Sequence, residues 1–224
     1  MELLFLGTGS ANWLAGLDEI PDFIRRDSSV LIDSTLLIDP GPCVLEALGT
    51  FGCDAGKIKY IINTHMHDDH YCENTIRNLE EKGAEFITIK AGETVQFGKY
   101  TVAAFKGNHA VIPTAHFLIS DGEREVYYGL DGAMLVPEAL EAIKSRHTDT
   151  VILEGTLGFD VERGALEHNN MNMVVELASE LKAHVGEIYI SHISRKYQPD
   201  HETLSRTMSE YGVRVAYDGL KIQI

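Results

Sequence analysis

Short runs of β-branched and other apolar residues, separated by Gly, Asn and Asp turns, fill most of the first half of the chain. Such runs are typical of β-strands. The predicted strands are Leu3–Leu6, Ser29–Ile32, Thr35–Ile38, Lys59–Asn63, Glu85–Lys90, Tyr100–Phe105, His116–Ser120 and Glu125–Tyr128. A helix is predicted over Asp69–Lys82, with Gly83 as its C-cap. Asp121-Gly122 predicts a hairpin turn between the last two strands.

Strands and helices alternate in the second half. The predicted elements are helix Pro137–His147, strand Thr150–Leu153, helix Asn170–Ala183, strand Glu187–Ser191, helix Asp200–Tyr211 and a closing hairpin of Val213–Tyr217 and Lys221–Ile224 over Asp218-Gly219. A strand-rich first half followed by alternating strands and helices predicts two mixed sheets covered by helices. This is an α/β sandwich rather than a barrel. Because no linker or composition break divides the chain, we expect one domain over residues 1–224.

Composition and charge narrow the class of protein. The chain has 19 Lys and Arg against 34 Asp and Glu, a net charge of −15, which disfavours binding to large nucleic acids. No apolar run approaches the roughly 18 residues of a membrane-spanning helix. The segment Met1–Leu6 is short and acidic, unlike a signal peptide, so a cytoplasmic location is expected. Cys43, Cys53 and Cys72 show no CxxC spacing and are expected to be reduced thiols.

The strongest chemical signal is the segment Thr64–His70, which has a His-x-His-x-Asp-His pattern. His65 and His67, two residues apart on an extended turn, can point at one cation. Asp69 and His70 can reach a second cation beside it. Imidazole and carboxylate ligands suit Zn²⁺, Mn²⁺ or Fe²⁺, and the absence of thiolates argues against a structural zinc knot. The alternative is a polar loop whose side chains only bond one another.

Further ligand candidates follow the ends of predicted strands. His109, Asp131 and His192 each come just after such a strand, where open α/β sheets assemble their sites. Asp131 is the natural bridging ligand, because a carboxylate can hold two metals about 3.5–4 Å apart.

In these motifs the chain resembles a metallo-β-lactamase-fold hydrolase along its whole length. Leu6–Ser10 is similar to the family's opening strand and turn, and Leu37–Gly41 to its Asp-x-Gly turn. The resemblance implies a four-layer αββα sandwich, α/β or α+β in class, with a dinuclear site on one edge. It implies one metal held by His65, His67 and His109 and another held by Asp69, His70 and His192, with Asp131 shared. Zinc is the expected metal, with manganese or iron as alternatives.

Two later motifs are similar to the phosphodiesterase branch, tRNase Z and the cyclic phosphodiesterase accessory to carbon–phosphorus lyase. These motifs are Glu167–Asn172 and Ile190–Tyr197. In those relatives a histidine at the place of His168 faces the scissile phosphate. The resemblance implies that His168 and Asn170 bind substrate and that His168 contacts a phosphoryl oxygen or protonates the leaving alkoxide. The alternative is that both residues merely cap the following helix.

The expected function is therefore metal-assisted hydrolysis of a small cyclic or nucleotide-like phosphodiester. Asp69 is expected to orient the attacking hydroxide as well as bind metal. The alternatives are a metallohydrolase of a thioester, lactone or β-lactam, and a metal- or ligand-binding module without turnover. The expected partners are a small anionic ester and, as an option, a second copy of the chain in a homodimer, with no membrane and no large nucleic acid.

Several residues around this centre have two interpretations. Asp39 either fixes the histidine loop from behind or only forms a turn. Arg25-Arg26 and Arg195-Lys196 either contact substrate phosphate or are solvated charges. The irregular segment Ser10–Asp27, which contains Trp13, is either a lid or a surface loop.

Overall fold

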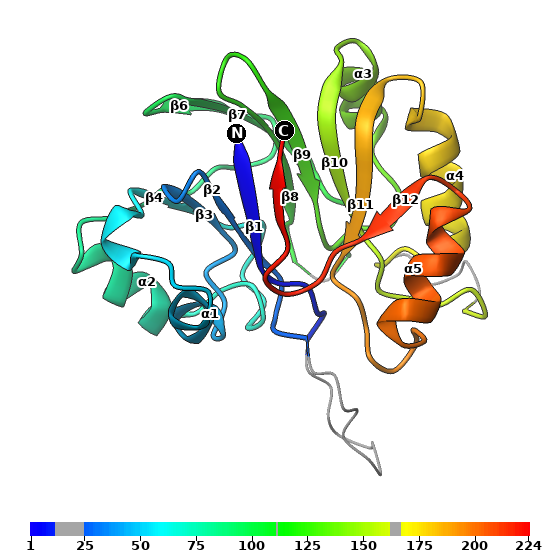
Figure 1. Cartoon of the computed structure of the whole chain (residues 1–224). Coiled ribbons are helices and arrows are strands. Elements are labelled where there is room, and N and C mark those ends of the chain that lie inside the picture. The colour runs from blue at the N-terminus through cyan, green and yellow to red at the C-terminus, as the bar shows by residue number, and fades with distance from the viewer. Residues whose placement is uncertain (12–24, 111, 162–166) are drawn as a thin grey trace.

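Two β-sheets pack face to face in the centre of the molecule, and helices cover their outer faces (Figure 1). The computed structural model describes residues 1–11, 25–110, 112–161 and 167–224. The first sheet has the strand order β13-β1-β2-β3-β4-β5, and the second has the order β12-β11-β10-β9-β8-β7-β6. This arrangement confirms the predicted αββα sandwich.

The first sheet is built mainly from the N-terminal part of the chain. Its strands are β1 (Glu2–Gly7), β2 (Ser29–Ile32), β3 (Leu36–Ile38), β4 (Tyr60–Ile62), β5 (Glu85–Phe86) and β13 (Lys221–Gln223). The pairs from β13 to β3 are antiparallel, and β4 and β5 continue the sheet in parallel. The first and last strands are therefore neighbours, with Leu3 opposite Ile222.

The second sheet joins an antiparallel half to a parallel half. Its strands are β6 (Thr94–Phe97), β7 (Tyr100–Lys106), β8 (Ala115–Ser120), β9 (Glu125–Gly129), β10 (Thr148–Glu154), β11 (Val185–Ser191) and β12 (Val213–Val215). The strands from β6 to β9 form an antiparallel meander, and β9 to β12 run parallel. The parallel strands all point their C-terminal ends to one edge, where the loops can gather functional side chains.

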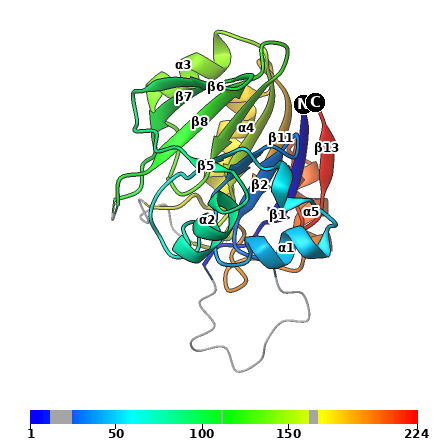
Figure 2. The same cartoon turned by 90° about the vertical axis from the view of Figure 1, so that its left-hand side faces the viewer.

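Helices lie on both outer faces (Figure 2). Those on the first sheet are α1 (Val44–Thr50) and α2 (Glu73–Glu80), together with the 3₁₀ turn η1 (Ala55–Lys57); those on the second are α3 (Pro137–Lys144), α4 (Met171–Leu181) and α5 (His201–Ser209). Pro137 occupies the first turn of α3, where its missing N–H costs nothing. Asp200 caps α5 by accepting a hydrogen bond from the amide of Thr203 at 2.9 Å.

Three apolar layers hold the sandwich together. The layer between the sheets contains the fully buried Phe5, Phe117 and Tyr128. A second layer lies under α3, α4 and α5, and a third under α1 and α2. Each large buried side chain contributes about 1.5–3 kcal/mol to folding. The site loops therefore project from a rigid double sheet.

The predicted closing hairpin is wrong. β12 pairs with β11 in the second sheet, whereas β13 pairs with β1 in the first. Between them the chain crosses from one sheet to the other: the amide of Ala216 donates to Ile190 O at 2.9 Å, and that of Gly219 donates to Phe5 O at 2.8 Å. The Asp218-Gly219 turn is real, but a turn dipeptide does not determine which partner each flanking strand finds.

The histidine loop also differs from its prediction. Helix α2 begins at Glu73, not Asp69, because residues 67–70 form a separate turn in which the amide of His70 donates to His67 O at 2.9 Å. The amide of Cys72 then donates to Pro40 O at 2.9 Å, which ties the loop to the neighbouring turn. Three further differences concern short elements: β5 is shorter than predicted, and β6 and α1 were not predicted.

Among the described residues, no helix is long and apolar enough to span a membrane. The three cysteines are free thiols, as predicted.

Candidate metal centre

Loops from both sheets bring the seven predicted metal ligands together. His65, His67, Asp69 and His70 lie between β4 and α2, His109 follows β7, Asp131 follows β9, and His192 follows β11. Except for the half-buried His67 and Asp69, these residues are buried. Residues more than 120 positions apart in the sequence thus meet at one edge of the sandwich.

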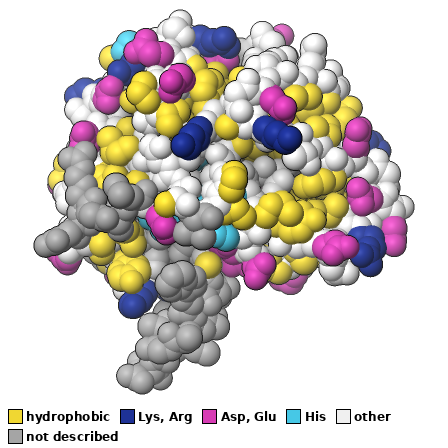
Figure 3. All heavy atoms as spheres, turned by 180° about the vertical axis from the view of Figure 1, so that it is seen from behind, with side chains coloured by type: hydrophobic (Ala, Val, Ile, Leu, Met, Phe, Trp, Pro, Cys, Tyr) yellow, Lys and Arg dark blue, Asp and Glu magenta, His cyan; other side chains and the backbone are white. Residues whose placement is uncertain are grey.

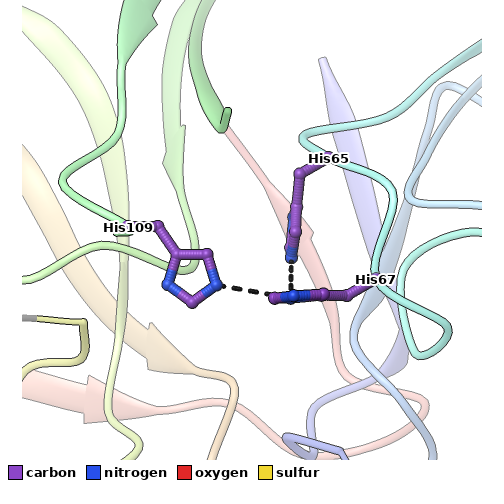
Figure 4. Close-up of side chains that lie close together, drawn as sticks. All are labelled: His65, His67 and His109. Atoms are coloured by element: carbon purple, nitrogen blue, oxygen red, sulfur yellow. Dashed lines mark hydrogen bonds between the residues drawn. The ribbon is translucent and has the colours of Figure 1, made fainter. Parts of the chain in front are cut away.

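The first ligand group consists of His65, His67 and His109, whose rings point toward one another in Figure 4. His65 Nε2 lies 2.9 Å from His67 Nδ1, and His109 Nε2 lies 3.3 Å from the same atom. Three ring nitrogens that share one small volume match the three-histidine arrangement of a Zn²⁺ site.

The second group consists of Asp69, His70 and His192. Asp69 Oδ2 lies 3.4 Å from His70 Nε2 and 3.5 Å from His192 Nε2. Asp131 stands between the two groups, because its Oδ2 is 2.6 Å from His70 Nε2, 3.3 Å from His192 Nε2 and 3.5 Å from His65 Nε2.

Unpartnered atoms indicate that this centre is built for a cation. His70 Nε2, His192 Nε2 and Asp131 Oδ2 are buried, and they make no hydrogen bond of acceptable geometry within the described part of the chain. Buried polar atoms without partners are costly, so such a convergent group needs a ligand. Atoms that approach within 2.6–3.3 Å without hydrogen-bond geometry fit lone pairs directed at a shared metal.

Electrostatics agree with this interpretation. Burial and the neighbouring His70 lower the pKa of His65 to about 2, so His65 is neutral and keeps a free lone pair. For His70, burial opposes the charged form, but the nearby carboxylates, Asp131 first, raise its pKa well above the usual value. Burial likewise opposes ionisation of Asp131, yet the charges of His192 and His70 hold its pKa well below the usual range. The centre therefore stabilises positive charge at its middle.

On the side of the first sheet, Asp39 supports the ligands from behind, which is the first of its two interpretations from the sequence. It is fully buried, and its Oδ2 accepts from His70 Nδ1 at 2.9 Å and from the Tyr128 hydroxyl at 3.0 Å. Its Oδ1 accepts from the amide and the hydroxyl of Thr64, at 2.7 and 2.9 Å. The Thr64 hydroxyl also lies 2.9 Å from His65 Nδ1. Such partners orient ligand histidines toward the metal.

On the side of the second sheet, Glu154 and Thr156 play a comparable part, and the sequence did not point to either. Glu154 is fully buried at the end of β10, and its Oε2 lies 3.0 Å from His168 Nδ1. The Thr156 hydroxyl lies 2.8 Å from His192 Nδ1 and donates to Glu154 Oε2. Glu154 follows a predicted strand, just as Asp131 and His192 do, so the rule that found those residues could have found Glu154.

His168 lies beside the ligand cluster. Its Nδ1 is 3.3 Å from Asp131 Oδ1, its ring stacks on that of His192 with centroids 5.6 Å apart, and its side chain is 25% exposed. Its Nε2 makes no hydrogen bond to the described residues. Burial opposes protonation, but the charge of Glu154 raises the pKa of His168 to about 9. Figure 3 shows histidine side chains at the surface near the middle of that face, beside hydrophobic ones. The partly exposed side chains of His67 and His168 open the cluster to solvent.

Asn170 has a different place from the one predicted. Its side-chain oxygen accepts from the amide of Met173 at 2.9 Å and caps α4, and its side-chain nitrogen donates to Val161 O at 2.8 Å. The side chain is buried and bonded at both ends. The alternative interpretation, a helix cap, therefore holds for Asn170 but not for His168.

The candidate phosphate-binding cations are mostly structural. Arg25 is buried and donates to the Thr8 hydroxyl at 2.6 Å and to Ala216 O at 2.7 Å. Arg26 pairs with Glu46 at 2.5 Å, and Arg195 donates to Arg25 O at 2.7 Å. Of the segment Ser10–Asp27, interpreted as either a lid or a surface loop, residues 12–24 lie outside the described residues, and Trp13 is among them.

Three residues of the centre and its support have left-handed backbone. Asp39, Asp131 and His192 have φ values of 59°, 55° and 55°. This region is unfavourable for residues with a Cβ, and such strain persists where surrounding contacts hold it. Each of the three follows or flanks a strand end, where the kink turns its side chain into the cluster.

Comparisons with known proteins agree with the fold and the ligand pattern. The model of the metallo-beta-lactamase superfamily matches residues 26–75, which include the histidine loop. A ribonuclease Z from Mycolicibacterium gilvum (strain PYR-GCK) is 34% identical over 76 residues, 33% of this chain. That match spans only 24% of the length of the ribonuclease Z.

Solved structures superpose along the whole chain. The metallo-beta-lactamase fold protein YhfI from Bacillus subtilis has a TM-score of 0.77 at 19% identity, and 99% of this chain and 98% of that chain are covered. A diphosphatase from the PhnP family also has a TM-score of 0.77, at 21% identity, with 100% and 97% covered. Human tRNase Z, short form, has a TM-score of 0.72 at 19% identity, with 100% and 99% covered. These structures show that the chain has the metallo-β-lactamase fold, and the superfamily model matches the segment that carries the histidine loop.

Proposed function

We propose that the protein is a dinuclear metal-dependent phosphodiesterase that hydrolyses a small cyclic or nucleotide-like phosphodiester. His65, His67 and His109 would hold one divalent cation, Asp69, His70 and His192 the other, and Asp131 would bind both. Zinc is the expected metal, with manganese and iron as alternatives. Two such cations, when bound, polarise a phosphoryl oxygen and lower the pKa of water toward 7.

The observation that carries the phosphodiester assignment is the placement of His168. Its Nδ1 is engaged with Glu154 at 3.0 Å, whereas its Nε2 is left without a partner among the described residues. Burial opposes protonation of this ring, but the Glu154 carboxylate at Nδ1 favours it and raises the pKa, so the ring is suited to give a proton to a leaving alkoxide. When water adds to phosphorus and the P–O bond breaks, the alkoxide would take this proton, and the imidazole would regain one from solvent.

The expected substrate is small and anionic. The net charge of −15 opposes a polyanionic partner, whereas the two cations make the centre locally positive. Met66, which is 52% exposed in the histidine loop, offers an apolar contact for the organic part of an ester. Asp69 would orient the nucleophile: burial favours its neutral form, but the charges of His70 and His192 hold its pKa far below the usual range.

Hydrolysis of bis(p-nitrophenyl) phosphate by protein loaded with Zn²⁺ or Mn²⁺ tests the proposal, followed by a panel of cyclic nucleotides and cyclic sugar phosphates. We expect turnover that a chelator abolishes and that added metal restores. The variant His168→Asn keeps an N–H near the place of Nδ1 but removes the proton donor. It should lower kcat on diesters with poor leaving groups by about 10²–10⁴-fold.

A parallel panel of a thioester, a lactone and a β-lactam separates the competing hydrolase assignments. Acyl substrates with good leaving groups need less protonation, so His168→Asn should affect them much less. Faster hydrolysis of an acyl substrate than of any diester would overturn the phosphodiesterase proposal. No hydrolysis of any ester by fully loaded protein would overturn enzymatic function altogether.

A further inference from the structure

The hydroxyl of Thr156 lies at the meeting point of the metal centre and the proposed acid. Thr156 is 6% exposed, and its Oγ1 is 2.8 Å from His192 Nδ1 and 3.4 Å from His168 Nδ1. It also donates to Glu154 Oε2. Glu154, His168 and His192 could by their spacing hold a cation of their own. The Thr156 hydroxyl contacts all three, so a hydrogen-bonding group already fills this position.

Chemistry fixes the direction of these hydrogen bonds. A neutral imidazole carries one N–H, and His192 turns its Nε2 toward Asp131 and Asp69, where a cation needs a lone pair. The hydrogen of His192 therefore resides on Nδ1, and the Thr156 oxygen must accept it. The single hydroxyl hydrogen then has two acceptors, the backbone oxygen of His192 at 3.1 Å and the closer, charged Glu154 Oε2, which also accepts from His168. The carboxylate is the stronger acceptor and takes it.

The hydroxyl has no substitute in this arrangement. Glu154 Oε2 lies 3.9 Å from His192 Nδ1, too far for a direct hydrogen bond. On the other side of the centre, His70 reaches its carboxylate, Asp39, directly at 2.9 Å. Without the Thr156 oxygen, the Nδ1–H of His192 would lose its 2.8 Å acceptor, and the tautomer of the ring would no longer be set from behind.

We infer that Thr156 is a positioning residue that joins the second metal site to the proton donor. Its oxygen holds His192 in the Nδ1–H tautomer, so that Nε2 faces the cation. Its hydrogen fixes the Glu154 oxygen that orients His168. The part of this inference that concerns His168 rests on the proposed function, whereas the part that concerns His192 depends only on metal binding.

Thr156→Val, which keeps the side-chain shape, and Thr156→Ser, which keeps the hydroxyl, test the inference. Thr150→Val is a matched control, because Thr150 is also a buried threonine of the β10 region and its hydroxyl has no partner among the described residues. The readouts are the number and affinity of Zn²⁺ ions bound per chain and the histidine ring N–H signals in ¹⁵N–¹H NMR spectra of the zinc-loaded protein. Neither readout requires turnover.

We expect Thr156→Val to weaken the second Zn²⁺ by about 10–100-fold and to alter one ring N–H signal, while Thr156→Ser and Thr150→Val match the unaltered protein. If Thr156→Val fails to fold, Thr156→Ala should show the same loss. Unchanged zinc affinity and ring signals in the valine or alanine variant would overturn the inference, as would a serine variant that behaves like valine. An unaltered protein that hydrolyses no diester would refute the proposed function but leave these outcomes intact.

Discussion

The two sheets support the same metal centre through two buried carboxylates that differ in one respect. Asp39, from the first sheet, has four hydrogen bonds, and Tyr128, Thr64 and His70, which provide them, are all buried. Glu154, from the second sheet, also has four, but one comes from His168, whose side chain is 25% exposed. Asp39 therefore bonds buried groups alone, whereas Glu154 also holds a histidine that reaches solvent.

The two oxygens of Glu154 divide these tasks. Oε1 accepts from the amides of Gly132 and Asn169, both at 3.0 Å, and so ties together the loops that carry Asp131 and His168. Oε2 accepts from Thr156 and His168. In Asp39, by contrast, both oxygens bond buried groups, so this residue orients His70 and contributes to the stability of the fold.

The largest effect is expected at Asp131, which lies between the two ligand groups. Asp131→Asn removes the shared negative charge, so we expect fewer than two Zn²⁺ per chain and no detectable hydrolysis of bis(p-nitrophenyl) phosphate. Metal analysis and the hydrolysis assay measure both, and His184→Asn, a histidine remote from the cluster, is the control. Two Zn²⁺ per chain in Asp131→Asn would show that the two ligand groups bind metal without the shared carboxylate.

Asp39→Ala should mainly reduce stability. It leaves His70, Thr64 and Tyr128 with buried groups that have lost their acceptor, so we expect the free energy of unfolding to fall by about 3–5 kcal/mol. Urea denaturation of the metal-free protein measures this change. A loss below about 1 kcal/mol would mean that the two carboxylates do not differ in the way described.

Glu154→Gln should mainly reduce activity. The glutamine oxygen can keep the two amide bonds of Oε1, but its NH₂ group would meet the N–H of His168 and the hydroxyl of Thr156. We expect hydrolysis to fall by about 10–100-fold with a much smaller loss of stability than in Asp39→Ala. Kinetics and urea denaturation of the same preparation test this; equal stability losses in the two variants would contradict it.

The smallest effect is expected at an ion pair remote from the centre. Burial opposes ionisation of Asp33, but Lys99 at 2.8 Å lowers its pKa below the usual value. A carboxyl with a lowered folded pKa stabilises the protein above its unfolded pKa and loses that contribution as pH falls through the folded pKa. Lys99→Gln should therefore cost about 0.5 kcal/mol at pH 7 and nearly nothing near pH 2, with unchanged metal binding. A loss that did not depend on pH would contradict this origin.

The clustering of the seven candidate ligands could be predicted from the sequence, because these residues either lie close together in it or follow strand ends. Glu154 also follows a predicted strand, but its sequence neighbours are apolar and include no histidine. Its hydrogen bond to His168 is therefore seen only in the folded structure. Thr156 could not be recognised, because a single threonine in the sequence does not indicate which groups its hydroxyl will contact. The helix cap at Asn170 is a local signal, which the sequence offered as the alternative to substrate binding. The separate sheets of β12 and β13 depend on long-range packing, which local turn signals do not encode.

The pairing of β1 with β13 has a consequence for the order in which the chain can fold during synthesis. Glu2 faces Gln223 across that pair, so the edge of the first sheet stays open until nearly the last of the described residues has left the ribosome. Contacts that span so much sequence close slowly. The exposed edge of β1 is then a place where a nascent chain could pair with another chain, and a chaperone or rapid closure by β13 would have to protect it.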